Sequence, residues 1–344
     1  MSPTNAARRF VDSPDSPVFL TVCVIGKNEA DNLPGLVRSL RALQELPYRV
    51  ETIFVDSAST DDTVEIAKVF FDQVFVLKPS RNLCASAARY VSTGAAAGRW
   101  LLYLDGDMEL SVTFLDLLSS LRVLDDTGRG WVGIYHDCFP DGATRPIGIR
   151  LNNLGVISQF GGAVLLSREL VLRAGNWNPA VFSNEEIDLY TRMRRIGGTV
   201  VWHPVLMVTH ITDRVPAWRV VVGNVIPSVW MGKKCYGFGQ IIASRIRGGG
   251  LWNFIRWYPV PFFCWASTLG ALATGLIFGP LAGAALFAVG FGGASFAVGW
   301  KRAFLFNLLL GHAVMGIWHY DSAYVPEIAA HYTPSPRTDA SDSQ

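Results

Sequence analysis

Apolar and polar positions alternate between two periods along the first hundred residues. Four short apolar runs, ended by polar or small residues, are typical of strands buried on both faces of a sheet. These runs lie at residues 19–25, 49–55, 73–77 and 100–104. Apolar stripes at helical spacing separate them and predict helices over 32–43, about 59–70 and 84–97. This alternation predicts an α/β fold with a mainly parallel sheet flanked by helices.

Acidic residues follow three of these strand runs. Residues 26–29 end in Asn28 and Glu29, Asp56 follows the second run, and Asp105-Gly106-Asp107 follows the fourth. In parallel sheets, ligands bind at the carboxyl ends of strands, so we expect these side chains to converge. Carboxylates suit a hard divalent cation, Mg²⁺ or Mn²⁺, that bridges a diphosphate. The sequence therefore predicts a site for a cation and a nucleoside diphosphate.

Other phosphate-binding classes lack support. The first strand is not followed by Gly-x-Gly-x-x-Gly, and the chain has no Gly-x-x-x-x-Gly-Lys-Ser/Thr, which disfavours a dinucleotide dehydrogenase and a P-loop enzyme. The 344 residues include 30 Lys and Arg against 28 Asp and Glu. This balance provides no strongly basic field and disfavours nucleic acid as a partner.

Further candidates for chemistry lie beyond residue 180. Glu185 and Glu186 precede a helical pattern, where they either stabilise the helix N-terminus or supply a general base. His210 ends an apolar strand run and is either a third metal ligand or a buried, hydrogen-bonded histidine.

The C-terminal part is strongly apolar. Residues 257–300 contain no charged residue over 44 positions, more than the roughly 20 residues of one bilayer span. With a turn at Gly279-Pro280, we expect a transmembrane hairpin of helices at about 259–278 and 281–300. The apolar stretch at 303–320 is either a third span or a helix in the lipid interface.

Basic residues flank this hairpin. Residues 214–256 hold seven Lys and Arg and no acid, interleaved with aromatic residues, and Lys301 and Arg302 follow the hairpin. Such a distribution suits an anionic headgroup layer and places both flanks in the cytoplasm. We therefore expect a multi-pass protein of the cell (inner or plasma) membrane with a cytoplasmic catalytic domain.

Five segments result from this partition. They are a flexible N-terminus at 1–17, a catalytic domain at 18–213, a basic aromatic juxtamembrane segment at 214–256, the membrane helices at 257–320 and a polar tail at 321–344.

The order of motifs in the first domain resembles glycosyltransferase family 2, which has the Rossmann-like GT-A fold. The resemblance covers residues 18–213 and rests on VCVIGKNE, VDSASTDDT, ASAARYVSTGAAAGRWLLYLDGD, FGGAVLLSRE and NEEIDLYTRMRRIGG. It implies an inverting enzyme that uses a nucleotide-activated sugar, a UDP- or GDP-sugar, with Mg²⁺ or Mn²⁺.

The resemblance also implies roles for single residues. On the donor side, Asn28 and Glu29 line the nucleoside and Asp56 recognises the base. Asp105 contacts the metal and diphosphate together with Asp107. Arg89 matches an arginine often found near the nucleotide, although Tyr90 follows it where the family often has Asn.

On the acceptor side, the second acid of a Glu-Asp pair is the usual base. Glu186 holds that position here, and Glu185 competes for the role. Gly161, Gly162 and Ala163 correspond to the segment near the acceptor sugar.

The acceptor follows from the membrane segments. Processive relatives carry Gln-x-x-Arg-Trp after the acidic motif, and its absence here favours a non-processive enzyme. The apolar hairpin and the basic residues beside it suggest a lipid or lipid-linked saccharide acceptor, in glycan, cell-envelope polysaccharide or glycolipid synthesis. The alternative is that the helices only anchor an enzyme whose acceptor is soluble.

Two other classes stay open. A haloacid-dehalogenase phosphatase also places Asp-x-Asp after a strand, as Asp105-Gly106-Asp107 does, but Glu109 stands where that motif has Thr or Val. A non-catalytic membrane interaction subunit would have lost acidic positions that this chain retains.

Overall fold

The computed structural model describes residues 17–120, 127–147, 155–213 and 236–333. The chain forms two compact units. Unit 1 comprises Met1–Pro179, Glu185–Arg214 and Tyr324–Gln344, and unit 2 comprises Ala180–Asn184 and Val215–Ala323. Most of the expected N-terminal segment, residues 214–235 of the basic segment expected at 214–256, and the end of the tail lie outside the described residues.

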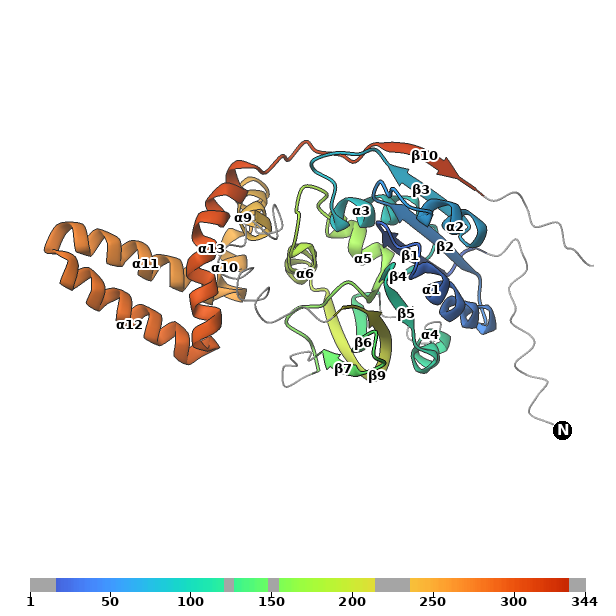
Figure 1. Ribbon diagram of the computed structural model, residues 1–344, viewed down its shortest axis with the longest axis horizontal. Helices are drawn as coiled ribbons and strands as arrows, with labels where there is room; N and C mark the ends of the chain where they lie inside the picture. The colour runs from blue at the N-terminus through green and yellow to red at the C-terminus, as the bar shows by residue number, and fades with distance from the viewer. Residues whose placement is uncertain (1–16, 121–126, 148–154, 214–235, 334–344) are drawn as a thin grey trace, which may run out of the picture. The chain divides into compact units, whose positions relative to one another are not determined.

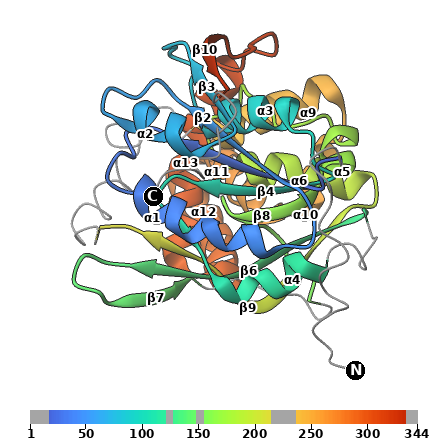
Figure 2. The same cartoon turned by 90° about the vertical axis from the view of Figure 1, so that its right-hand side faces the viewer.

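Unit 1 is built on one sheet, which has ten strands within the described residues. The strands are β1 (Leu20–Gly26), β2 (Val50–Asp56), β3 (Gln73–Leu77), β4 (Trp100–Asp105), β5 (Met108–Leu110), β6 (Arg129–Cys138), β7 (Thr144–Ile147), β8 (Val164–Ser167), β9 (Thr199–Ile211) and β10 (Ile328–Tyr332). Their order is β10-β3-β2-β1-β4-β8-β6-β9-β5, with β7 beside β6. Figure 2 shows this order from β10 at the top to β7 and β9 at the bottom.

The predicted parallel core is confirmed. β3, β2, β1 and β4 are adjacent and parallel. Helices cover both faces: α1 (Leu33–Leu40), α2 (Thr63–Phe70) and α4 (Leu115–Ser120) on one, and α3 (Ala85–Ala95), α5 (Arg168–Arg173) and α6 (Glu185–Arg195) on the other. Along β4, Trp100 and Leu102 pack into one core and Leu101 and Tyr103 into the other, which explains the uninterrupted apolar run.

Strand register brings the acidic strand ends to one edge of the sheet. Gly26 lies opposite Asp56, and Ile25 lies opposite Asp105. The long β9 adds His210, which lies opposite Met108 of β5 and opposite Asp137 of β6. The sheet therefore gathers residues that are far apart in the sequence.

The tail differs from the sequence-based expectation. Residues 321–344 were expected to be a polar tail, but Ile328–Tyr332 forms β10 and pairs antiparallel with β3. His331 stacks on Phe75, with 4.1 Å between ring centroids, and the Lys68 ammonium lies 4.0 Å from the Tyr332 ring centroid. A five-residue strand acquires stability only by pairing with an existing edge, so local pattern does not reveal it.

Unit 2 is helical. Its helices are α9 (Gly237–Gly248), α10 (Leu251–Trp257), α11 (Pro259–Phe278), α12 (Pro280–Val298) and α13 (Trp300–Trp318). Gly279 turns the chain between α11 and α12 with a φ of +95°, and a Cβ at Gly283 would lie 2.8 Å from the Gly275 Cα. The expected helical hairpin is therefore present, with glycines at the close approach (Figure 1).

Within the described residues, two helices are long and apolar enough to cross a membrane. They are Pro259–Phe278 and Pro280–Val298, of which only 22% and 17% are buried. Core helices of soluble proteins are mostly buried, so this exposure favours contact with lipid.

Candidate active site

The loops after β1 and β2 are joined by hydrogen bonds. The Asn28 amide donates to the Ser59 Oγ (2.8 Å), and the Thr60 amide donates to the Asn28 Oδ1 (2.9 Å). The Ser59 amide and hydroxyl both donate to the carboxylate of Asp56, which is fully buried. The helix predicted over about 59–70 begins only at Thr63, because Ser59 and Thr60 belong to this loop network instead.

Glu29 connects this loop pair to the Asp-x-Asp turn. Its backbone amide donates to the Thr63 Oγ1 (2.7 Å), and its carboxylate accepts from the Asn32 Nδ2 (2.8 Å). A Cβ added at Gly106 would lie 2.8 Å from the Glu29 Cγ, so the turn passes directly over this side chain. Partial burial and the nearby carboxylates of Asp107 and Asp105 raise the pKa of Glu29.

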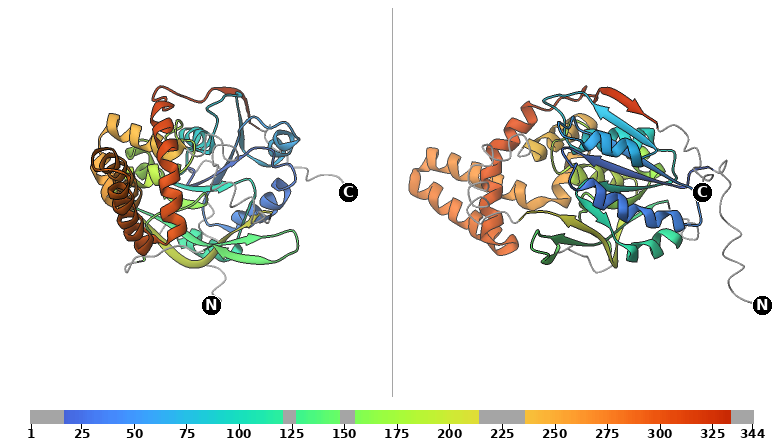
Figure 3. Two further views of the ribbon diagram at one scale, coloured as in Figure 1. Left: turned by 60° about the vertical axis from the view of Figure 1, so that its left-hand side comes forward. Right: turned by 45° about the vertical axis from the view of Figure 1, so that its right-hand side comes forward.

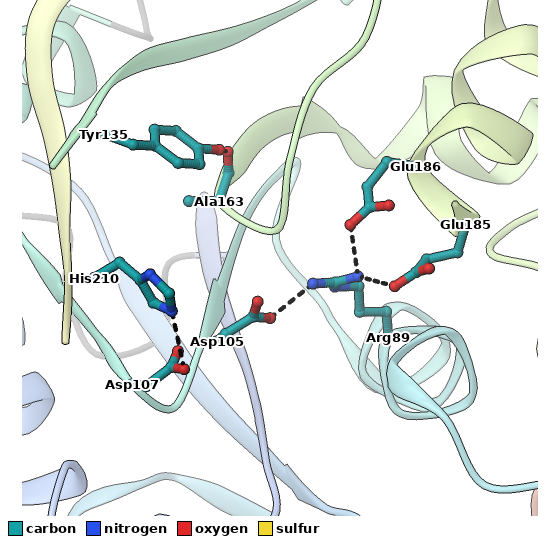
Figure 4. A network of polar contacts seen from close by, with 8 residues as sticks. All are labelled: Arg89, Asp105, Asp107, Tyr135, Ala163, Glu185, Glu186 and His210. Atoms are coloured by element: carbon teal, nitrogen blue, oxygen red, sulfur yellow. Dashed lines mark hydrogen bonds and ion pairs between the residues drawn. The ribbon is translucent and has the colours of Figure 1, made fainter. Parts of the chain in front are cut away.

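Arg89 of α3 joins the Asp-x-Asp turn to the acidic pair of α6 (Figure 4). Its guanidinium donates to Asp105 Oδ1 (2.7 Å), Glu185 Oε1 (2.8 Å) and Glu186 Oε1 (3.4 Å), and the side chain is only 2% exposed. Burial alone would lower the pKa of Arg89, but the three carboxylates outweigh it and raise the pKa. The guanidinium therefore remains charged and holds three acids close together.

The two glutamates differ in their surroundings. The side chain of Glu185 is 8% exposed, and that of Glu186 is 19% exposed and more distant from Arg89. Burial, with the charge of Glu185, raises the pKa of Glu186 to about 8. A more accessible carboxylate with a raised pKa is suited to accept a proton near neutral pH.

A second cluster surrounds Asp107. The His210 Nε2 lies 3.2 Å from Asp107 Oδ2, and its Nδ1 lies 3.0 Å from Asp137 Oδ1. Asp137 also accepts from Arg145 (2.6 Å). Hydrogen bonds to Asp107 and Asp137 raise the pKa of His210 to about 9. The sequence allowed His210 to be either a metal ligand or a hydrogen-bonded histidine. The structure is compatible with both, because the imidazole is hydrogen-bonded and lies beside the Asp107 carboxylate.

The Asp107 cluster suits a divalent cation. Asp107 Oδ1 is buried and has no hydrogen-bond partner within the described residues. No group of three His, Cys, Asp or Glu side chains in that part of the chain is arranged to hold a metal ion. However, Mg²⁺ and Mn²⁺ sites at phosphates often use one or two protein ligands and take the rest from phosphate and water. Asp107 and His210 fit that requirement, whereas Asp105 Oδ1 is bonded to Arg89.

The glycine segment before β8 lies against the Asp105–Arg89 pair. A Cβ at Gly162 would lie 2.3 Å from Asp105 Oδ2 and 2.9 Å from the Arg89 Nη2, so any larger residue would force the Asp105 carboxylate or the Arg89 guanidinium to shift. A Cβ at Gly161 would lie 3.3 Å from the Tyr135 ring, and the Tyr135 hydroxyl donates to the carbonyl of Ala163. Of the three expected acceptor-side residues, Gly162 therefore lies beside Asp105, and Gly161 and Ala163 lie against Tyr135.

Sequence reasoning missed two residues of this site, Tyr135 and Asp137. Both lie on β6, two positions apart, and therefore point to the same face of the sheet. The only available signal was the apolar alternation of β6, which identifies a strand but not its neighbours. Their contacts with Ala163 and His210 arise from strand order.

Comparison with known proteins agrees with this geometry. The family model for glycosyl transferase family 2 matches residues 21–142, which include β1 to β4, Arg89 and the Asp-x-Asp turn. Residues 21–142 are therefore similar to glycosyltransferase family 2. This match gives no support to the haloacid-dehalogenase alternative.

Two curated relatives match parts of the chain. Glycosyltransferase AglE of Haloferax volcanii is 27% identical over 130 residues, which cover 37% of this chain and 42% of the relative. Cholesterol galactosyltransferase of Borreliella burgdorferi is 26% identical over 112 residues, covering 32% of this chain and 30% of the relative. The chain therefore spans less than half the length of the curated relatives that it matches.

Solved structures extend the likeness beyond the segment that the family model matches and show the GT-A fold. The mannosyltransferase PcManGT of Pyrobaculum calidifontis, in complex with GDP-Man and Mn²⁺, has a TM-score of 0.51 at 18% identity, covering 92% of this chain and 93% of its own. S. aureus TarS 1–349 has a TM-score of 0.50 at 13% identity, covering 88% and 89%. The expected fold class is thus confirmed.

Proposed function

We propose that this protein is an inverting, non-processive glycosyltransferase. It transfers a sugar from a UDP- or GDP-sugar to a hydroxyl of a lipid or lipid-linked saccharide at the cytosolic membrane face. The observation that carries the proposal is the set of hydrogen bonds made by Arg89. Its guanidinium holds Asp105 of the Asp-x-Asp turn beside the two candidate bases, Glu185 and Glu186. The Mn²⁺ and GDP-Man of the PcManGT structure support a donor of this class and a divalent cation.

Glu186 is the proposed general base. In the reaction, the acceptor oxygen bonds to the anomeric carbon while the bond from that carbon to the diphosphate breaks. The hydroxyl proton goes to the Glu186 carboxylate, and the bond electrons leave with the nucleoside diphosphate. Glu186 suits this role better than Glu185 because it is more exposed and is less tightly paired with Arg89. No covalent sugar–enzyme intermediate is required, so a separate nucleophile is not expected.

Asp107 and His210 are the proposed cation ligands. A bound Mg²⁺ or Mn²⁺ would neutralise the charge that develops on the leaving diphosphate. Arg89 positions Asp105 and the two glutamates, and Gly162 leaves room for their approach. On the donor side, we propose that Asn28, Glu29 and Asp56 line the nucleoside, since their loops are joined at the adjacent edge of the sheet.

The proposed acceptor rests on unit 2 and on one relative. Two exposed apolar helices suit a lipid environment, and the Borreliella burgdorferi relative is named for a sterol acceptor. We propose that the enzyme acts at the inner or plasma membrane with its catalytic domain in the cytoplasm. A soluble acceptor, with the helices serving only as an anchor, is the competing outcome of the test.

The test uses the full-length protein in lipid nanodiscs with Mn²⁺, a panel of UDP- and GDP-sugars and a membrane lipid extract. We expect release of nucleoside diphosphate together with a glycosylated lipid, detected by mass spectrometry. Release that requires only a soluble acceptor would overturn the lipid assignment. Binding of none of these donors would favour a non-catalytic subunit.

A matched pair of variants tests the base. Glu186→Gln should lower turnover at least about 100-fold, the lower range for loss of a general base. Glu65→Gln, on the exposed surface of α2, should leave turnover unchanged. If Glu186→Gln retains full activity and Glu185→Gln does not, the base is Glu185.

A further inference from the structure

We infer that, among the described residues, the chain crosses the bilayer twice, through α11 and α12, and that α13 lies along the lipid surface on the side of the catalytic domain. The inference rests on the membrane association proposed above but not on sugar transfer. It decides between the two readings of residues 303–320, a third span or an interfacial helix.

The first step is the return of the chain to unit 1. β10 pairs with β3, and the Lys78 amide donates to the Glu327 carbonyl (2.8 Å) at the end of that pairing. β3 pairs in turn with β2, which carries Asp56. Residues 327–332 and the catalytic strands are therefore parts of one folded sheet. A sheet cannot be divided by a bilayer, so the chain between residues 213 and 324 must cross an even number of times.

The second step identifies the crossing helices. α11 and α12 have 20 and 19 residues, and a rise of about 1.5 Å per residue gives each a length of about 30 Å, the thickness of the hydrocarbon core. Near the hairpin turn, Leu276, Phe278 and Leu281 are all more than three-quarters exposed. Apolar side chains that are exposed over the whole length of two helices are typical of helices surrounded by lipid.

The third step concerns α13. A third span would make the number of crossings odd and would place β10 on the wrong side of the bilayer. α13 also carries Lys301, His312 and Asn307, and among the described residues its Leu309–Trp318 part is found as a shorter apolar helix. In Figures 1 and 3, α13 runs across the hairpin of α11 and α12 rather than beside it. If α11 and α12 are parallel to the membrane normal, α13 lies in the membrane plane.

Contacts within unit 2 support this placement. The Asn307 amide donates to the Ala303 carbonyl (2.9 Å), its carbonyl accepts from the Thr268 hydroxyl of α11, and the Trp265 indole donates to the Phe306 carbonyl (2.7 Å). These contacts join α13 to the half of α11 that is remote from the hairpin turn. Trp300 and Trp318 lie at the two ends of α13 and are 62% and 84% exposed. Tryptophan prefers the headgroup level, where an interfacial α13 would place both of its ends.

The first experiment determines the sides of the membrane. Epitope tags are placed in the full-length protein at the N-terminus, after Gly279 or after Ala323, and antibody access is compared in inverted and right-side-out vesicles. We expect the tags at the N-terminus and after Ala323 to share one side and the tag after Gly279 to lie on the other. Opposite sides for the first two tags would overturn the inference, as would the same side for all three.

A depth measurement tests α13 directly. Val289, at the middle of α12, and Val314 of α13 are both exposed, and each is changed to Cys and spin-labelled in vesicles, with unchanged protein as the background control. We expect oxygen to relax the label at 289 strongly, and a water-soluble nickel complex to reach the label at 314. Equal depth at both positions would contradict an interfacial α13.

These outcomes are separable from the proposed function. Release of the protein by alkaline carbonate would refute membrane association itself, and the donor panel tests sugar transfer without reference to topology.

Discussion

Arg89 lies among three carboxylates, and its guanidinium donates to Asp105, Glu185 and Glu186. Ionised acids so close together would repel one another without a shared cation. Lysine carries the same charge but lacks a planar fork of donors, so it could not bridge all three acids equally well. The structure therefore favours a positioning role for Arg89. Direct contact with the nucleotide, which the resemblance implied, stays a prediction.

Gly162→Ala tests the close packing at this network. The new Cβ would lie 2.3 Å from Asp105 Oδ2, a carboxylate that Arg89 holds in place. We expect turnover to fall roughly 100-fold, because displacement of about 1 Å at reacting groups costs that much. Gly94→Ala is the control, since a Cβ at Gly94 in α3 meets nothing within 4 Å. Unchanged turnover for Gly162→Ala would show that Asp105 can move without effect.

The raised pKa of Glu186 predicts a pH dependence of activity. A base acts when deprotonated, so kcat/KM should rise from pH 6 and level off above the pKa of about 8. Initial rates at saturating Mn²⁺ across this range would measure the rise. A profile that is flat from pH 6 to 9 would argue against a base with a pKa in that range.

The same group should change stability in the opposite direction. Between pH about 4.5, the ordinary value, and pH about 8, folded Glu186 retains a proton that the unfolded chain has lost. The folded state then binds more protons, so the free energy of unfolding decreases as pH rises through this window. In the Glu186→Gln variant, the free energy of unfolding should therefore differ less between pH 5 and pH 8 than in the unchanged protein. Thermal unfolding at the two pH values would measure this difference. An unchanged difference between the two pH values would contradict the assignment.

Asp137 is expected to strengthen cation binding through His210. Its carboxylate meets the His210 Nδ1, which leaves Nε2 directed at Asp107. Loss of such a partner typically weakens metal affinity about 10- to 100-fold. We therefore expect Asp137→Asn to raise the dissociation constant for Mn²⁺, measured by calorimetry on the apo protein, whereas Asp116→Asn on exposed α4 should not change it. Equal affinities would remove His210 or Asp137 from the cation site.

At the scale of elements, the central strands and their helices were predictable because each carries its own pattern. β4 is apolar at every position from Trp100 to Leu104, since one core receives its even-numbered residues and the other its odd-numbered residues. β10 carries no such pattern and depends on the edge of β3. Its pairing covers an apolar strand edge that would otherwise be open to association with other chains.

Removal of β10 tests this protective role. Truncation after Ala323 deletes the strand, whereas truncation after Thr333 keeps it. Four cross-strand pairs would be lost in the first case, worth about 1–4 kcal/mol. We expect the shorter protein to unfold at least about 3 °C earlier and to aggregate on size-exclusion chromatography. If the two truncated proteins behave alike, β10 contributes nothing to the stability of the sheet.

At the scale of the whole molecule, the chain makes its long departure from unit 1 after Arg214 and returns at Tyr324. Both passages therefore occur on one side of any membrane that unit 2 enters. The basic residues on each flank of the uncharged stretch at 257–300 are consistent with that side being cytosolic. Connectivity and charge thus agree on a hairpin, although they are independent observations.

The sequence by itself determined the α/β class, the acidic strand ends and the apolar helices, because periodicity and composition are local properties of a chain. Tertiary structure alone decided that Arg89 bonds Asp105 and both glutamates, that Asp137 meets His210, and that residues 328–332 join the sheet. Those contacts link positions up to about 250 residues apart through strand order and register. No short-range pattern encodes such proximity, since it arises only when the sheet has formed.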